Sequence, residues 1–517
     1  MNLTPLTGWL ISIQSRKYLG PESLMTKINT SLLEVSSFAA VSSEQNLRVG
    51  LFGVGLEAYW PQFPELKRRL DGYMSQVAIR LSRPGVEITD LGIIDTPNRA
   101  LEASHELRRA DVDIVFLYIT TYALSATVLP LMRRLKVPLI VLNLQPTSRI
   151  DYANFNRLPD RQSMTGEWLA YCSACPLPEF VNVFRRSGIE MHEVTGVLEG
   201  EDACWKDVDD WISAAQVVAD LEQNRLGLLG HYYSGMLDIY TDLTLLSAVF
   251  GVHIEILEVE ELARLRAEAE AEVIESRVEL FEQAFEMQDG CDPTDIAEAA
   301  RTSVALDRLV EQHGLKSVAY YHKGTGNIEN EQAISSIILG TSLLTAKGIP
   351  VAGEYEVKNV LAMKILSSLG AGGSFSEFYA TDFEDDVVLM GHDGPGHVAI
   401  AEGKPKVRSL AVYHGKVGRG LSIEMSVRHG PVTLLSLAED PGRGFKLVVA
   451  EGESVPGPTL EIGNTNSRYR FSIGARRFLS EWSAAGPAHH CAIGVGHLAS
   501  TIEKVGALLG IPVIHVC

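Results

Sequence analysis

Short apolar segments alternate with amphipathic segments from residue 47 onward, and this alternation restricts the fold more than any other feature of the chain. Four of the apolar segments are rich in Val, Ile and Leu, as buried strands are: 47–55, 86–92, 112–118 and 137–143. The first intervening segment carries Leu66, Leu70 and Met74 at helical spacing. Strands that alternate with helices predict a parallel sheet with right-handed crossovers, which is a doubly wound, Rossmann-like α/β domain.

The same pattern returns in the middle of the chain. Residues 226–230 predict a strand, and the segments 318–324 and 349–354 predict strands that end in polar loops. Residues 258–287 form a charged run with Glu and Arg four residues apart, which predicts a long helix with a solvated face. We therefore expect a second Rossmann-like α/β domain.

The pattern changes after the glycine-rich stretch 370–373. Short β-rich segments with frequent Gly and Pro follow, which predicts an antiparallel sheet or barrel: 386–390, 409–413, 421–427, 432–437 and 445–449. The chain then closes with a predicted helix near 502–509 and a predicted strand at 511–516. We expect a poorly ordered extension at 1–45, α/β domains at 46–222 and 223–368, and a β-rich domain at 369–517.

The charge balance disfavours two classes of partner. The 517 residues include 45 basic and 65 acidic side chains, and the formal net charge of −20 disfavours binding to nucleic acid or to anionic lipid. No apolar run reaches the ~18–20 residues that a membrane-spanning helix needs. We therefore expect a cytoplasmic protein that acts on a small molecule, without a membrane or nucleic-acid partner.

The six cysteines do not form a disulfide framework in a chain of this length. Cys172 and Cys175 have C-x-x-C spacing, but a zinc ribbon needs a second such pair, and the sequence has none. We favour buried structural thiols over a redox pair, because free cysteine usually packs as a small hydrophobic side chain. Reduced thiols of this kind are typical of the cytosol.

Two carboxylates and two imidazoles stand in Gly-rich or aromatic settings on four separate segments. Glu354 directly follows a predicted strand, Glu377 follows the glycine-rich turn, and His392 and His490 do not lie on predicted helices. A mixed N/O set of this kind suits Mn²⁺, with Zn²⁺, Co²⁺, Fe²⁺ or Mg²⁺ as alternatives. We hypothesise that the four side chains hold one divalent cation for chemistry on a small polar substrate.

Other assignments stay open at this point. Five neighbouring side chains could replace a member of the set: Glu356, His397, His414, His429 and His489. Each of the four could also be an ordinary residue, because Glu is mostly solvated and a lone His often serves a hydrogen bond in the core. The chain has no G-x-S-x-G motif and no P-loop, and Gly53-Val54-Gly55 lacks the later glycine of a dinucleotide fingerprint.

Polar residues follow the predicted strands of the first sheet. Residues 120–122 follow the third strand, and Asn143 and Gln145 end the fourth. Ligands bind at the carboxyl ends of parallel strands, so these residues are candidate substrate contacts. Asp393, in contrast, lies in a turn, and we expect it to make an Asx hydrogen bond there rather than to coordinate a metal.

Four motifs occur in an order that resembles L-arabinose isomerases and their relatives. The motifs are Gly353-Glu354-Tyr355-Glu356, Gly372-Gly373-Ser374-Phe375-Ser376-Glu377-Phe378-Tyr379, the Gly391-His392 loop and Ala488-His489-His490. The resemblance runs from about residue 46 to the end and is most specific in the C-terminal third. It implies two α/β domains followed by a β-rich domain, a homo-oligomer (trimer or hexamer), and an active site near a subunit interface.

The resemblance also implies roles for individual residues. The two glutamate and two histidine metal ligands of the family fall on Glu354, Glu377, His392 and His490, and the two glutamates are also its catalytic, proton-transferring groups. Contacts to the sugar fall on a further set of side chains: Tyr59 or Trp60 in the first Gly-rich loop, Gln145, Met236 and His489.

The implied reaction interconverts an aldose and its 2-ketose through an enediolate that the metal stabilises. Tyr355-Glu356-Val357 stand where the family tends to have Gly-Asp-Trp, and a His-Asp-Gly-Pro-Gly-His loop replaces an apolar continuation. These departures keep the predicted metal ligands and change the residues around them. They therefore bear on the identity of the sugar more than on the type of reaction. L-fucose isomerase-like enzymes share the general plan and are a closely related alternative. Two other functions compete: another metal-dependent enzyme on a sugar derivative, such as an epimerase or hydrolase, and a non-catalytic sugar-binding protein on the same fold.

Overall fold

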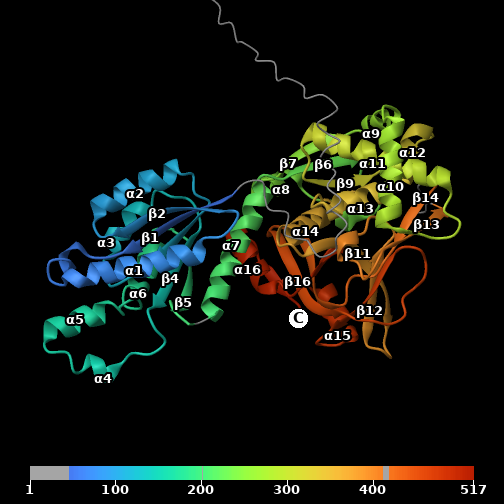
Figure 1. Cartoon of the computed structure of the whole chain (residues 1–517). Coiled ribbons are helices and arrows are strands. Elements are labelled where there is room, and N and C mark those ends of the chain that lie inside the picture. The colour runs from blue at the N-terminus through green and yellow to red at the C-terminus, as the bar shows by residue number, and fades with distance from the viewer. Residues whose placement is uncertain (1–45, 201, 412–417) are drawn as a thin grey trace, which may run out of the picture. The chain divides into compact units, whose positions relative to one another are not determined.

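The computed structural model describes residues 46–200, 202–411 and 418–517, so the extension predicted at 1–45 lies outside the described residues. The first sheet has five parallel strands in the order β2-β1-β3-β4-β5. They are β1 (Leu47–Val54), β2 (Val86–Ile94), β3 (Ile114–Tyr118), β4 (Leu139–Gln145) and β5 (His192–Val197). The predicted parallel α/β architecture is confirmed here (Figure 1).

Helices cover both faces of this sheet, because its central strands are apolar on both sides. One apolar cluster joins the sheet to α1 (Pro64–Leu81) and α7 (Asp202–Glu222). Another joins it to α2 (Pro97–Arg109), α3 (Ser125–Met132) and α6 (Leu177–Arg186). The helices α4 (Tyr152–Phe155) and α5 (Arg161–Leu169) lie in the chain between β4 and α6.

The second sheet is also parallel and has the order β10-β9-β6-β7, which confirms a second Rossmann-like unit. Its strands are β6 (Arg225–Gly230), β7 (His253–Leu257), β9 (Ser317–Tyr321) and β10 (Val351–Ala352). The helices in this part are α8 (Leu243–Phe250), α9 (Val259–Ala267), α10 (Ala271–Ala284), α11 (Pro293–His313), α12 (Ile328–Ser335), α13 (Ile338–Ala346) and α14 (Val357–Ser368).

The charged run at 258–287 differs from its prediction as one long helix. It forms two helices, α9 and α10, because the chain leaves helical conformation at residues 268–270. The guanidinium of Arg308 on α11 donates to the carbonyl of Glu268 at this break. One side of α9 is buried through Val259, Leu262 and Leu265. Of its charged side chains, Arg266 is also buried, and the others define its outer side.

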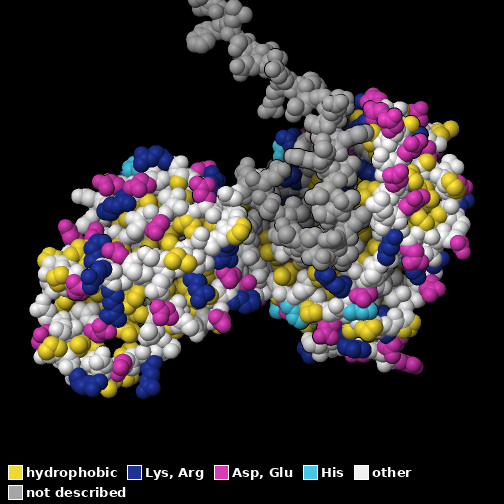
Figure 2. Space-filling view, viewed as in Figure 1, with side chains coloured by type: hydrophobic (Ala, Val, Ile, Leu, Met, Phe, Trp, Pro, Cys, Tyr) yellow, Lys and Arg dark blue, Asp and Glu magenta, His cyan; other side chains and the backbone are white. Residues whose placement is uncertain are grey.

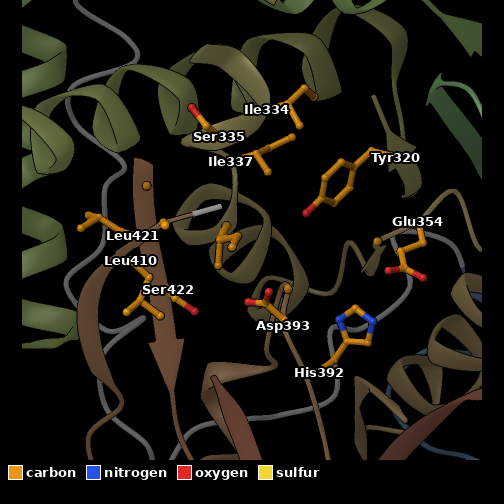
Figure 3. A pocket seen from close by; sticks show the side chains of 15 residues that line it. Tyr320, Ile334, Ser335, Ile337, Glu354, His392, Asp393, Leu410, Leu421 and Ser422 are labelled. Carbon is orange, nitrogen blue, oxygen red and sulfur yellow. The ribbon is translucent and has the colours of Figure 1, made fainter. Parts of the chain in front are cut away.

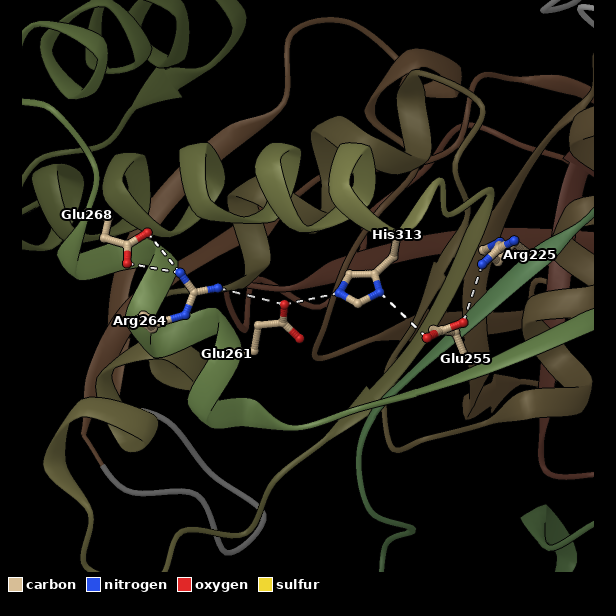
Figure 4. A network of polar contacts seen from close by, with 6 residues as sticks. All are labelled: Arg225, Glu255, Glu261, Arg264, Glu268 and His313. Carbon is tan, nitrogen blue, oxygen red and sulfur yellow. Dashed lines mark hydrogen bonds and ion pairs between the residues drawn. The ribbon is translucent and has the colours of Figure 1, made fainter. Parts of the chain in front are cut away.

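That outer side of α9 belongs to an ion network (Figure 4). Arg264 bonds to Glu268 at 2.9 Å, as the i,i+4 spacing predicts. A second arm, which the spacing does not predict, runs through His313 of α11, whose ring lies 3.1 Å from Glu261 and 3.7 Å from a β7 carboxylate, Glu255. The network therefore connects α9 and α11 to the edge of the sheet.

The C-terminal part contains a closed, six-stranded antiparallel barrel, as the β-rich pattern predicts. Its order is β15-β18-β11-β12-β17-β16, and pairing of β15 with β16 closes it. The strands are β11 (Gly372–Asp382), β12 (Val387–His392), β15 (Gly430–Asp440), β16 (Gly444–Ser454), β17 (Thr465–Phe471) and β18 (His490–Val495). Outside it, β19 (Val513–His515) pairs in parallel with β16. The helices are α15 (Ala475–Ala484) and α16 (Ala499–Leu509).

Two of the predicted β-rich segments lie in a different sheet. The strands β13 (Lys406–Ala411) and β14 (Arg419–Glu424) form an antiparallel pair, and β13 also pairs in parallel with β8 (Glu286–Met287). Strand β14 contacts α11, α12 and α13 of the second unit. An alternating pattern indicates a strand but not its partner, so this placement is a result of the tertiary structure.

Helix α14 connects the second sheet to the barrel. It contacts β9 on one side and β11, β15 and β18 on the other, and every side chain from Val357 to Ile365 is buried. Its buried Lys358 donates to the carbonyl oxygens of Asp238 at 2.7 Å and Tyr240 at 3.2 Å. This packing fixes residues 353–356, which precede the helix, beside the barrel.

The face of the molecule shown in Figure 2 has basic side chains interspersed with acidic ones. On this face they therefore do not form the continuous positive surface that binds a nucleic-acid backbone. Within the described residues, no helix combines the length and the apolar composition that crossing a membrane requires.

Candidate metal centre and active site

Glu354 projects from a strained turn between β10 and α14. Glu354 and Tyr355 have φ angles of 57° and 62°, in the left-handed region that non-glycine residues rarely adopt. Each such residue costs on the order of 1–3 kcal/mol, and strain of this kind clusters at functional sites. The turn is held by a hydrogen bond of 2.9 Å from the Tyr355 amide to the Tyr320 carbonyl, and by packing of the Tyr355 ring on Tyr232.

The other three predicted ligands come from neighbouring strands of the barrel. Glu377 on β11 pairs with His490 on β18 and, on its other side, with Gly391 on β12. His392 follows Gly391 at the end of β12. The barrel therefore gathers Glu377, His392 and His490, although more than 110 residues separate the first from the last.

His490 lies next to predicted ligands from both the β10–α14 turn and the barrel strands. It is fully buried, and its Nε2 lies 3.3 Å from the Glu354 carboxylate. Ligand atoms of Glu377, His392 and His490 all lie within 4.8 Å of one another, and so do those of Glu354, His489 and His490. His490 therefore belongs to both groups: one contains Glu354, and the other contains Glu377 and His392.

Glu356 lies on the other side of His490 and was among the alternative ligands. Its carboxylate is fully buried and is 3.4 Å from Nδ1 of His490, so it orients the ring toward Glu354. Burial by itself disfavours the charged imidazolium, but hydrogen bonds and charge from Glu354 and Glu356 outweigh it and raise the pKa of His490 to about 9. The cluster thus attracts positive charge, which a bound cation would supply.

An aromatic ring packs against both predicted ligand imidazoles, whose own ring centroids are 5.1 Å apart. The ring of Phe375, two residues before Glu377 on the same face of β11, is 4.2 Å from His392 and 4.5 Å from His490, measured between centroids. His489 packs on His490 at 3.8 Å and bonds through Nδ1 to Asp238 at 2.6 Å. His489, predicted as a sugar contact, therefore borders the cluster.

The donor set fits a divalent cation. Two carboxylates balance the charge of such an ion, imidazole nitrogens suit Mn²⁺ or Zn²⁺, and Glu356 supplies the outer hydrogen bond that fixes a ligating histidine. Glu354, Glu377, His392 and His490 are the residues that would hold it. Glu354 is 8% exposed and Glu377 is half-buried, so the carboxylates are sheltered but not sealed from solvent.

A pocket lies beside Glu354 and His392 (Figure 3). Asp393 and Tyr320 line it next to the two ligands, and leucines of β13 and β14 line it from the other side. Ser422 of β14 also lines it; its buried hydroxyl has no hydrogen-bond partner among the described residues and can bond to a ligand or a water. No sequence motif marks Tyr320 or Ser422 as a site residue, because only the fold brings β9 and β14 to this site.

The remaining alternative ligands have other surroundings. His397 is buried, and its amide lies 3.3 Å from the Ser374 hydroxyl; burial lowers the pKa of its ring to about 4. His429 lies 3.7 Å from Glu402. Neither is in a group of ligand-distance side chains among the described residues, and His414 lies outside those residues.

The sugar contacts that the resemblance implies are spread over two sheets. Tyr59 and Trp60 follow β1, and the indole of Trp60 donates to Asp95 at 2.7 Å. Gln145 ends β4 and donates to the Thr147 carbonyl at 2.8 Å, while Met236 lies half-buried in the loop after β6. None of these four is among the described residues that line the pocket beside Glu354.

Polar groups near the ends of β3 and β4 are engaged within the protein. The hydroxyl of Thr121 donates to the Leu169 carbonyl at 2.7 Å, and that of Thr120 donates to the Val54 carbonyl. Asn143 donates to the Thr195 hydroxyl at 2.8 Å. These hydrogen bonds give the three side chains structural roles at the carboxyl edge of the first sheet.

The chain is similar to known proteins over the part that carries this site. Residues 372–512 match the family model of the L-arabinose isomerase C-terminal domain, a range that includes Glu377, His392 and His490. The chain is also similar to an L-arabinose isomerase of Saccharophagus degradans, with 24% identity over 450 residues that cover 83% of this chain and 85% of that protein.

Proposed function

The chain is a divergent member of the L-arabinose isomerase family, and from this premise we propose that it interconverts an aldose and its 2-ketose with a divalent metal. The observation that carries the proposal is the convergence of Glu354, Glu377, His392 and His490 from a strained turn and three barrel strands. Neither the second sheet nor the barrel alone contains this set.

The reaction moves a hydrogen between C1 and C2 of an open-chain sugar. A bound divalent cation supplies Lewis-acid stabilisation of the negative charge that develops on O1 and O2. Manganese is our first choice, because two carboxylates and two imidazoles suit it, and Zn²⁺, Co²⁺, Fe²⁺ and Mg²⁺ are alternatives.

We assign the proton transfer to the two carboxylates. One of Glu354 and Glu377 removes the proton from C2, and the other returns it at C1, as general base and acid. Support comes from their positions next to His490: the Glu354 carboxylate lies 3.3 Å from its ring, and Glu377 is its register partner on the neighbouring strand. Holding the reacting carbon atoms between two fixed groups lowers the barrier further.

The sugar contacts and the assembly belong to the same proposal. We assign sugar binding to Tyr59, Trp60, Gln145, Met236 and His489, with a trimer or hexamer in which a site forms near a subunit interface. Support comes from the pocket, which the described residues of the second unit and the C-terminal part line without any residue of the first sheet.

A chelation experiment with a panel of aldoses tests the function. Protein treated with EDTA is assayed for ketose formation from L-arabinose, L-fucose and D-galactose, before and after Mn²⁺ is added back. We expect no turnover without metal and recovery with it. Full activity in metal-free protein contradicts metal dependence. If none of the aldoses yields a ketose, and a sugar derivative is hydrolysed or epimerised instead, the isomerase assignment is wrong.

A further inference from the structure

The C-x-x-C pair lies in the turn between α5 and α6. The amide of Cys172 donates to the Leu169 carbonyl at 3.2 Å, and the same carbonyl accepts the Thr121 hydroxyl from the loop after β3. The turn is therefore fixed to the carboxyl edge of the first sheet.

The two thiols differ in their access to solvent. Cys172 is 5% exposed, whereas Cys175 is exposed, and both are free cysteines. The expectation that both thiols are buried is therefore wrong for Cys175, because three residues of a tight turn bring it to the opposite, outer side. An oxidant can reach Cys175 but not Cys172.

The turn brings the sulfur atoms together. Residues three apart in a helical turn have Cβ atoms about 5–6 Å apart, and a disulfide needs only a small further approach. The Cys172 and Cys175 thiols already interact, and the backbone amides of Cys175 and Tyr122 point at the sulfur of Cys172. Burial raises the pKa of Cys172 to about 11, which keeps it a thiol until Cys175 has reacted.

The pair borders a crevice of the first sheet. Strand order reverses between β1 and β3, and ligands of such sheets bind outside the carboxyl ends at that point. Tyr59, after β1, and Tyr122, after β3, both interact with the two thiols and pack in the same apolar cluster as Leu169. A change at the pair therefore acts on a loop to which we assign sugar binding.

We propose that Cys172 and Cys175 are a reversible dithiol–disulfide site that reacts with low-molecular-weight disulfides. The Cys175 thiolate attacks the disulfide, releases one thiolate and forms a mixed disulfide. The sulfur of Cys172 then attacks that of Cys175, the second thiolate leaves, and each cysteine proton passes to a released thiolate. Two cysteines are oxidised by two electrons, and one small disulfide is reduced to two thiols.

The full chain treated with oxidised glutathione tests the chemistry. We expect two of the six cysteines to become resistant to alkylation, an intramolecular link between Cys172 and Cys175 in the peptide mass spectrum, and reversal by dithiothreitol. Cys172→Ser is expected to stop at a glutathione adduct on Cys175, and Cys175→Ser to show neither product at this turn. A stable adduct on wild-type Cys175, or no reaction there, overturns the proposal.

A second arm tests the effect on the crevice and rests on the proposed function. We expect oxidation to change KM for the best aldose by about fivefold or more in the wild type and not in Cys175→Ser. Cys291→Ser, which alters a half-buried thiol of another part, is the matched control and is expected to respond as the wild type does. An unchanged KM in protein with the verified link overturns the coupling. The alkylation experiment does not depend on enzyme activity. It can therefore detect the disulfide even if the isomerase assignment is wrong.

Discussion

Single residues determine whether the site can bind a cation and move a proton. Glu354 and Tyr355 both have left-handed backbone conformation, which non-glycine residues rarely adopt. Tyr355 therefore combines two features: its ring packs on Tyr232, and its backbone is strained. Local geometry of this kind is a property of the turn that no spacing rule predicts.

Replacement of either glutamate tests the assignment directly. In Glu354→Gln or Glu377→Gln we expect kcat/KM to fall by more than the ~10²–10⁴ of one acid–base group, because metal affinity falls as well. Steady-state rates over a range of Mn²⁺ concentrations separate the two effects. Glu503→Gln, on the exposed side of α16, is the control, and near-normal turnover in either site variant refutes the assignment.

We expect His397 to make the stability of the protein depend on pH. Its folded pKa of about 4 lies below the ordinary value of 6.5, so the unfolded chain binds a proton that the folded chain does not in this window. Stability from this group is complete above pH 6.5 and is lost as the pH falls toward 4, by on the order of 3 kcal/mol in total.

Urea unfolding between pH 4.5 and 7 measures this loss. We expect His397→Gln to have a flatter dependence than the wild type, because the substituted side chain does not titrate. His105→Gln, which removes an exposed histidine of α2, is the control and is expected to keep the wild-type slope. Parallel curves for His397→Gln and wild type would show that His397 does not contribute.

At the scale of elements, the register of the barrel strands places the ligands. Strand β12 must lie close to β17 at Gly391, since a Cβ there would be 1.7 Å from the Thr465 carbonyl oxygen and 2.5 Å from its carbon. His392 is the next residue, and its amide donates to the Thr465 hydroxyl at 2.8 Å. Any shift between these strands therefore moves a ligand.

Gly391→Ala tests this dependence. We expect a loss of at least about 1–3 kcal/mol in the free energy of unfolding, because the backbone must move, together with weaker Mn²⁺ binding in calorimetry. Gly72→Ala, at an exposed position of α1 where the new methyl group meets nothing within 4 Å, should instead stabilise by up to ~1 kcal/mol. If Gly391→Ala binds Mn²⁺ as tightly as the wild type, the position of His392 does not depend on the register of β12 and β17.

At the scale of the whole molecule, the proposed function draws on residues from different parts of the sequence. The proposed metal ligands belong to the second unit and the barrel, whereas Tyr59 and Trp60 follow β1 of the first sheet and Gln145 ends β4. If a neighbouring copy supplies the first-sheet residues, each site needs two chains, and chains with different defects can complement each other.

Coexpression of two inactive chains tests this arrangement. We expect Glu354→Gln and a Gln145→Ala, Trp60→Ala double variant to be inactive or weak separately and to recover a measurable part of wild-type activity as mixed oligomers. Sedimentation should show three or six copies per particle. Absence of recovery in verified mixed oligomers would place each site within one chain.

Much of the fold follows from local pattern. The alternation of apolar and amphipathic segments predicts both parallel sheets, and the β-rich texture after residue 370 predicts the barrel. The pattern fails where a partner decides: the β13–β14 pair joins β8 rather than the barrel, and the run at 258–287 breaks where Arg308 takes the Glu268 carbonyl. Local periodicity predicts on which face of a helix or strand a side chain lies. It does not predict with which strand that element pairs.

The sequence by itself determined the types of side chain available for a metal site and the segments that carry them, because carboxylates and imidazoles next to strand ends and glycines are visible without a structure. Only the tertiary structure decided which of them meet. It set Glu377 beside His490 across two strands, Glu356 behind His490, and Tyr320 and Ser422 on the wall of the pocket. The physical reason is that closure of the barrel and burial of α14 are long-range events, and the distances between ligands exist only once those surfaces have packed.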